Sequence, residues 1–214
     1  MAKPDKEQED NQSLAERIAL DINIGVLRHG EWLKQSDLER RYGSNRFSLR
    51  RALDELATKR IVEYRPNRGY QVFEPDPEQR AEIREVRTLL ECHAAPSMVE
   101  NVSDEDLADL QKLAERFQEA IYNGTVLEQN EANVAFHMAL LELCSNKALA
   151  ELIKEYRQRG PAALVSRWQT FTQLEKANRD HFLMIEALKN RDASRLRLII
   201  EAHINQNEVP EQPN

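Results

Sequence analysis

The chain has 214 residues, of which 41% are hydrophobic and 31% are charged, and its formal net charge is −7. This length fits one large domain or two modest ones, and the composition excludes a disordered chain. Apolar runs are only a few residues long, whereas a membrane span needs about 20. The first 12 residues lack the basic flank and apolar stretch of a signal peptide, so we expect a cytoplasmic protein.

The first third of the chain predicts three helices followed by a hairpin. Residues 1–12 are expected to form a disordered tail. Ser13 and Glu16 have the spacing of a capping box at the start of a first helix. Two further helices and two strands, separated by a turn rich in Pro, Asn and Gly, are expected at residues 35–42, 45–59, 61–64 and 70–73. Three helices and a hairpin in this order describe a winged helix-turn-helix.

Beyond residue 78 every strong hydrophobic period is helical. Ser103 and Asp106 form a capping box, and Gly124 ends the helix that follows it. Pro96 is expected to kink or split the first long helix. The later helices are expected at residues 126–144, 147–159, 162–176, 178–190 and 193–206.

The expected fold class is therefore mainly α, with an N-terminal winged helix-turn-helix followed by an all-helical antiparallel bundle. The expected domains are a DNA-binding domain over 13–74, a linker over 75–77, an all-helical effector-binding and dimerisation domain over 78–207, and a tail over 208–214. Cys92 and Cys144 match no metal-knuckle or redox spacing and are expected to be free thiols.

The charge is unevenly distributed along the chain. Residues 32–73 contain ten Lys/Arg and five Asp/Glu, whereas residues 76–214 contain 16 Lys/Arg and 24 Asp/Glu. A basic patch on an acidic chain is the feature that matters for DNA binding, because DNA contacts one face of a protein. A solvated, Arg-rich surface is the alternative interpretation of the same pattern.

The candidate DNA-reading residues lie at the start of the second helix of the helix-turn-helix, which enters the major groove in such motifs. Arg46 and Arg50 are four residues apart and share one face, from which each guanidinium can bond both acceptors of a guanine. The full set of expected DNA-binding residues is Asn45, Arg46, Phe47, Ser48, Arg50, Arg51 and, at the hairpin tip, Asn67, Arg68 and Gly69. The alternative for Arg50 and Arg51 is pairing with Asp54 and Glu55 on an exposed helix.

Residues 22–33, 36–56 and 68–72 resemble the corresponding segments of GntR-family bacterial transcription regulators. In this resemblance Arg46, Arg50 and Gly69 coincide with positions at which the family contacts DNA. Two departures stand out. Ser36 occupies a position where the family usually has Arg, and Phe47-Ser48 replaces the usual Thr-Pro. We expect Phe47 to approach a thymine methyl group at the edge of the groove.

The rest of the chain resembles the all-helical (FCD) ligand-binding domain of the FadR-type subfamily, through residues 85–91, 133–137, 180–187 and 192–203. The resemblance implies a divalent, zinc-like metal held by an Asp and three His. The matching positions are Asn133, in place of the usual Asp, His137, His181 and His203. It also implies effector binding by Arg87. The alternatives are core histidines without a metal, and an internal salt bridge between Arg87 and Glu91.

Together these features predict a ligand-responsive transcription regulator that is not an enzyme. We expect a homodimer that binds double-stranded DNA at a near-palindromic operator, acts as a repressor, and responds to a small-molecule effector, expected to be a carboxylate. No membrane partner is expected. The competing hypotheses are a helical metal-dependent enzyme that uses the three histidines, and a scaffold whose winged helix binds protein.

Overall fold

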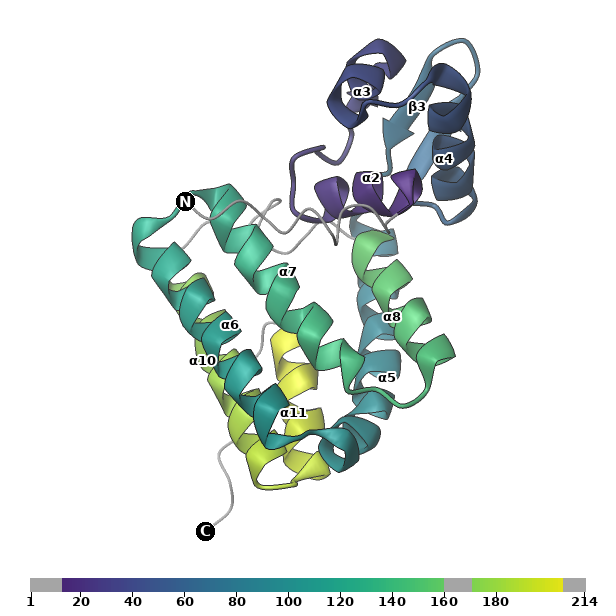
Figure 1. The fold of residues 1–214 in the computed structure, drawn as a ribbon. Helices are drawn as coiled ribbons and strands as arrows, with labels where there is room; N and C mark the ends of the chain where they lie inside the picture. Colours follow the sequence, from purple (N-terminus) through teal and green to yellow (C-terminus); the bar gives the residue numbers. More distant parts are fainter. Residues whose placement is uncertain (1–12, 160–170, 206–214) are drawn as a thin grey trace. The chain divides into compact units, whose positions relative to one another are not determined.

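The computed structural model describes residues 13–159 and 171–205. The chain divides into two compact units between Glu74 and Pro75, and each unit is described by itself below (Figure 1). The expected tails, 1–12 and 208–214, lie outside the described residues, as does the expected helix start at 162. No helix in the described ranges combines the length and apolarity that crossing a membrane requires.

The first unit contains three helices and a small antiparallel sheet. The helices are α2 (Leu14–Asn23), α3 (Gln35–Tyr42) and α4 (Arg46–Thr58), and the strands are β1 (Trp32–Leu33), β2 (Val62–Arg65) and β3 (Gly69–Val72). The strand order is β1-β3-β2, with Tyr64 opposite Tyr70 and Leu33 also opposite Tyr70. The capping box of Ser13 and Glu16 is confirmed. Strand β1 was not predicted, because two residues are too short to show an alternating pattern.

The core of this unit decides which face of α4 remains outside. Leu49, Leu53 and Leu56 are at most 1% exposed and pack with α2 residues such as Ile18 and Ile22. Because these buried positions recur every three or four residues, they occupy one side of α4. The other side of α4, which carries the arginines of its first turns, is left to solvent.

The second unit is entirely helical in the described residues. Its helices are α5 (Pro77–Asn101), α6 (Asp104–Asn123), α7 (Val126–Glu142), α8 (Lys147–Arg159), α10 (Phe171–Lys189) and α11 (Ala193–Asn205). The capping box of Ser103 and Asp106 is confirmed. Buried side chains from these helices form a common core that includes Phe136, Ile153, Leu188 and Leu196.

Several element ends differ from the sequence prediction by one or two residues, and three differences in the helical unit have a physical reason. Helix α5 already begins at Pro77, with Asp76 as its N-cap, because Pro is favoured at the first helical position. Pro96 does not split α5; it faces solvent, on the side where a freed carbonyl can bind water. Helix α10 runs through Ala177 without the predicted break, since Ala177 and Asn178 are buried in the bundle.

Candidate functional site

The start of α4 presents a polar and basic surface. Asn45 caps the helix, because its side-chain oxygen accepts a hydrogen bond of 2.9 Å from the Ser48 backbone N–H. That oxygen is therefore engaged, and the Asn45 amide N–H groups are the part that can donate to DNA. Arg46, Ser48, Arg50 and Arg51 are all exposed, and Phe47 is 72% exposed.

A short network connects α4 to the hairpin and restrains Arg50. The Tyr70 hydroxyl on β3 donates a hydrogen bond to the Asp54 carboxylate, and Arg50 Nε lies 4.0 Å from the other Asp54 oxygen. Burial, together with the Asp54 carboxylate, raises the pKa of Tyr70 to about 12, so the phenol stays protonated and can donate. The alternative for Arg50, an ion pair with Asp54, is thus present, but the contact is long and exposed to solvent. Glu55, the expected partner of Arg51, pairs with Lys59 at 2.9 Å.

The tip of the hairpin is a tight turn with a cation at its end. Asn67 and Gly69 have φ values of 65° and 92°, a region that glycine adopts freely. The Arg68 guanidinium lies over the Trp32 ring, 5.8 Å from its centre, which restrains a long side chain at the tip. Gly69 has open space around its Cα, so a phosphate backbone can approach closely there.

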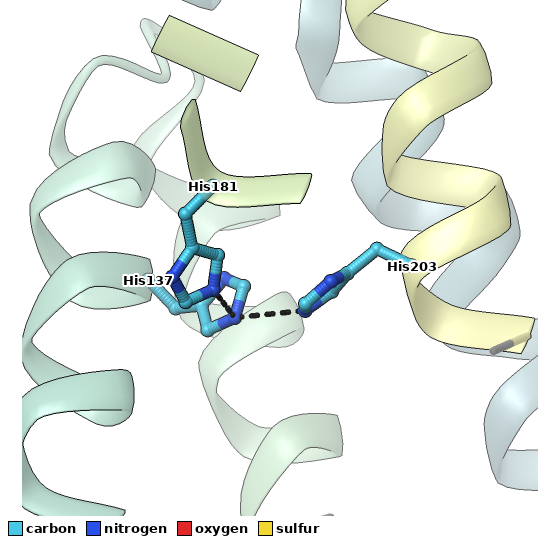
Figure 2. A group of neighbouring side chains, drawn as sticks. All are labelled: His137, His181 and His203. Atoms are coloured by element: carbon cyan, nitrogen blue, oxygen red, sulfur yellow. Dashed lines mark hydrogen bonds between the residues drawn. The ribbon is translucent and has the colours of Figure 1, made fainter. Parts of the chain in front are cut away.

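Three histidines gather inside the second unit, as Figure 2 shows. His137 on α7, His181 on α10 and His203 on α11 point their Nε2 atoms toward one another. His137 Nε2 lies 3.3 Å from His181 Nε2 and 3.2 Å from His203 Nε2. Nitrogens bound to one tetrahedral zinc at about 2.0–2.1 Å are separated by roughly 3.3 Å, so this spacing fits a shared cation.

The hydrogen-bonding capacity of the cluster points the same way. His203 Nδ1 lies 3.1 Å from Asp180 Oδ2, and a proton on Nδ1 for this bond leaves the His203 Nε2 as a lone pair. A single proton on His137 Nε2 cannot serve both neighbouring nitrogens well. His181 Nδ1 is buried, and within residues 13–159 and 171–205 it has no hydrogen-bond partner. Lone pairs that converge in this way are suited to a divalent metal.

The cluster is held in the neutral state that metal ligation requires. Burial lowers the pKa of His137 and His181 well below 6.5, and the Arg157 charge acts in the same direction. Burial also lowers the pKa of His203, although the hydrogen bond to Asp180 opposes this. Neutral imidazoles offer lone pairs, whereas imidazolium ions do not.

Asn133 lies one helical turn before His137 on α7 and is 8% exposed. Its side-chain oxygen is buried and has no hydrogen-bond partner among the residues that the structure describes. A buried carbonyl oxygen without a partner is costly, which is the expected situation of a group whose partner is a bound ion or water. The position therefore fits the ligand role predicted from sequence.

Arg87, whose side chain is 22% exposed, belongs to a largely buried ionic cluster near the histidines. Its Nε donates to Glu91 Oε1 at 2.9 Å, so the predicted alternative, an internal pair with Glu91, is present. Arg157 on α8 donates to the other oxygen of Glu91 at 2.6 Å, and its side chain is only 12% exposed. In the described part of the bundle two guanidiniums thus share one carboxylate, which leaves an excess positive charge there.

Sequence reasoning assigned no role to Arg157, to Lys176 or to Asp180, although Asp180 begins one of the segments that carry the resemblance. The Lys176 ammonium lies 2.7 Å from Asp180 Oδ2. Asp180 precedes His181 directly, and that Asp-His pair was the available signal.

The comparisons with known proteins decide the family. Residues 11–72 match the model of the bacterial regulatory proteins of the gntR family, and residues 82–206 match the FCD domain. The chain belongs to the GntR family. This GntR protein with an FCD domain is a DNA-binding transcription regulator, and the resemblance inferred from its sequence motifs is confirmed.

Its relatives agree along most of their length. The chain is 27% identical to the HTH-type transcriptional regulator McbR of Escherichia coli over 87% of this chain and 85% of McbR. It is 23% identical to the uncharacterized HTH-type regulator YdhC of Bacillus subtilis, over 85% and 81% of the two chains. The solved structure of E. coli McbR/YncC superposes with a TM-score of 0.82, at 26% identity over 90% and 92% of the chains. These names favour a regulator over a metalloenzyme.

Proposed function

We propose that this GntR regulator is a repressor that binds a near-palindromic operator as a homodimer and is released by a small carboxylate. Two copies would present two α4 helices to half-sites about one helical turn, roughly 34 Å, apart. The proposal rests on two features that occur in the same chain. One is the exposed, Arg-rich face of α4, and the other is the largely buried cationic cluster inside the helical unit. A regulator of bacterial DNA works in the cytoplasm, which is where we place it.

The reading surface consists of the residues named from the sequence. Arg46 and Arg50 would bond base edges, whereas Arg51, Arg68 and the amide of Asn45 would bond phosphates or the adjacent groove. Arg40 and Arg41, at the end of α3, also lie in the basic first unit, but both are already paired, Arg40 with Asp37 and Arg41 with Asp21. Phosphate contact by these two requires exchange of those partners.

The metal proposal assigns His137, His181 and His203 as ligands of a zinc-like ion, with the oxygen of Asn133 as a fourth donor. These residues would hold the ion, and its chemistry there would be that of a Lewis acid that favours an anionic effector. Asp180 would orient His203 through its Nδ1. The excess positive charge of Arg87 and Arg157 over Glu91 would attract the same anionic ligand.

Effector and DNA would then influence each other through one coupling free energy, typically about 1–3 kcal/mol. The decisive experiment is selection of duplexes from random DNA with the full-length protein, repeated in the presence of small carboxylates. We expect a palindromic consensus, a steep loss of affinity with salt, and weaker binding when the matching carboxylate is present.

Several outcomes would contradict parts of the proposal. No enriched sequence together with a flat salt response would favour a protein-binding scaffold. A consensus without two-fold symmetry would contradict the homodimer. Metal-dependent turnover of a small molecule that is lost in His181→Ala would revive the enzyme hypothesis, whereas Arg46→Ala should leave any such turnover unchanged.

A further inference from the structure

Phe47 is an exposed aromatic residue on the side of α4 that does not pack into the core. Its exposed fraction, 72%, is the highest among the large hydrophobic side chains in the described ranges. It is the second residue of α4, and the core of the unit is filled from α4 by Leu49, Leu53 and Leu56. The Phe47 ring therefore lies on the solvent side of α4 and is not a core residue displaced from the interior.

The neighbours of Phe47 are cationic. Arg46 precedes it, and Arg50 and Arg51 follow one turn later on the same side of α4. The Arg51 guanidinium lies 6.0 Å from the centre of the Phe47 ring. Because the ring contacts one guanidinium and lies among others, a purely hydrophobic patch of another protein is a poor partner for it. The surface suits an anionic partner that also exposes an apolar group.

In the major groove, that apolar group is the C5-methyl of thymine. The first turn of a recognition helix reaches base edges there, and apolar side chains contact this methyl. We propose that Phe47 is a specificity-determining residue that selects a thymine in each half-site through contact with its methyl group. The inference rests on the proposed binding of α4 to the bases of an operator. It adds recognition of thymine, whose methyl group the arginines cannot select.

The contact between Phe47 and Arg51 means that a Phe47 substitution also affects Arg51. Phe47→Ala removes the ring from the methyl and also frees Arg51, so loss of affinity in this variant alone would be ambiguous. A change on the DNA side avoids the ambiguity, because deoxyuridine differs from thymidine only by the missing methyl.

The experiment uses the full-length protein and the duplex recovered by selection from random DNA. Each thymine is replaced singly by deoxyuridine, and affinity is measured by fluorescence anisotropy. At one thymine in each half-site we expect about a fourfold loss for the wild type, the effect of burying one apolar carbon. The same replacement should have no effect on Phe47→Ala. Phe47→Leu should keep part of the sensitivity, and Tyr64→Ala, which changes another exposed aromatic, should keep all of it.

Two results would overturn the inference. One is wild-type affinity that is unchanged by deoxyuridine at every position. The other is an equal loss in the wild type and in Phe47→Ala, which would assign the methyl to a different residue. In both cases the consensus and the salt dependence would stand, so the proposed function would survive; a protein that enriches no sequence would end both.

Discussion

Arg157 Nη1 lies 2.6 Å from Glu91 Oε2, and both side chains are nearly inaccessible to solvent. Arg87 holds the other Glu91 oxygen at 2.9 Å. Burial alone would raise the pKa of Glu91, but the charges of Arg157 and Arg87 outweigh it and keep that pKa below 4.5. This cluster links α5 to α8 beside the histidines, so it supports the shape of the site as well as its charge.

Glu91→Gln is expected to destabilise the helical unit by about 3 kcal/mol, because it leaves two largely buried guanidiniums without their counter-charge. Urea unfolding, with hydrogen exchange read on α5 and α8 peptides, measures the loss. Glu142→Gln is the matched control. Its exposed carboxylate pairs with Lys147 at 3.7 Å, and such surface pairs contribute little. Equal stability of the two variants would contradict the role given to Glu91.

The same pair predicts a pH dependence. Because folding lowers the pKa of Glu91, its contribution is fully present above the unfolded value of about 4.5 and is lost as pH falls through the folded value. The stability difference between the wild type and Glu91→Gln should therefore be largest near neutral pH and shrink below pH 4.5. A difference that grows on acidification would show the opposite sign and refute the assignment.

Metal content tests the histidine cluster. Protein purified without chelator is expected to contain about one equivalent of a zinc-like metal by elemental analysis, and His181→Ala should lose it. Asn133→Asp should tighten binding in a chelator competition by about tenfold, because a carboxylate adds charge to the ligand set. His93→Ala, which changes an exposed histidine on α5, is the control and should keep the metal. Identical metal content in wild type and His181→Ala would rule out the site.

The parts of the fold that could be predicted from the sequence are those with local signals. Capping boxes at Ser13 and Ser103, and the left-handed Gly43 that ends α3, are encoded within a few residues of each helix end. Strand β1 has only two residues and is defined by pairing with β3, a partner far along the chain. The continuity of α10 through Ala177 likewise depends on burial against other helices.

The candidate site shows the same division. The three histidines could be identified because histidine is rare in this chain and because their order matches a family pattern. The structure brings all three together. Arg157 gave no comparable signal, since it is one of many charged residues on an amphipathic helix. Its importance arises only where α8 packs on α5 and places Arg157 against Glu91.

The connection between hairpin and recognition helix yields a further prediction. Tyr70→Phe removes the hydrogen bond to Asp54 and is expected to destabilise the DNA-binding unit by about 1 kcal/mol. Hydrogen exchange on β3 peptides should increase accordingly. Tyr64→Phe is the control, because that hydroxyl belongs to a ring that is 55% exposed on the neighbouring strand. Unchanged exchange in Tyr70→Phe would mean that the Asp54 contact does not secure the hairpin.

The arginines of α4 are expected to divide by role. Arg46→Ala should cost about 1–3 kcal/mol on the selected operator and relax the preference at one base pair per half-site, since a guanidinium that binds a guanine edge carries sequence information. Arg51→Ala should weaken binding to all duplexes alike and reduce the slope of log affinity against log salt, because a phosphate contact releases counterions without reading bases. Anisotropy titrations over a salt series, on the operator and on a scrambled duplex, separate the two effects. If Arg46→Ala weakens both duplexes equally, Arg46 contacts phosphate and the base-reading role passes to Arg50.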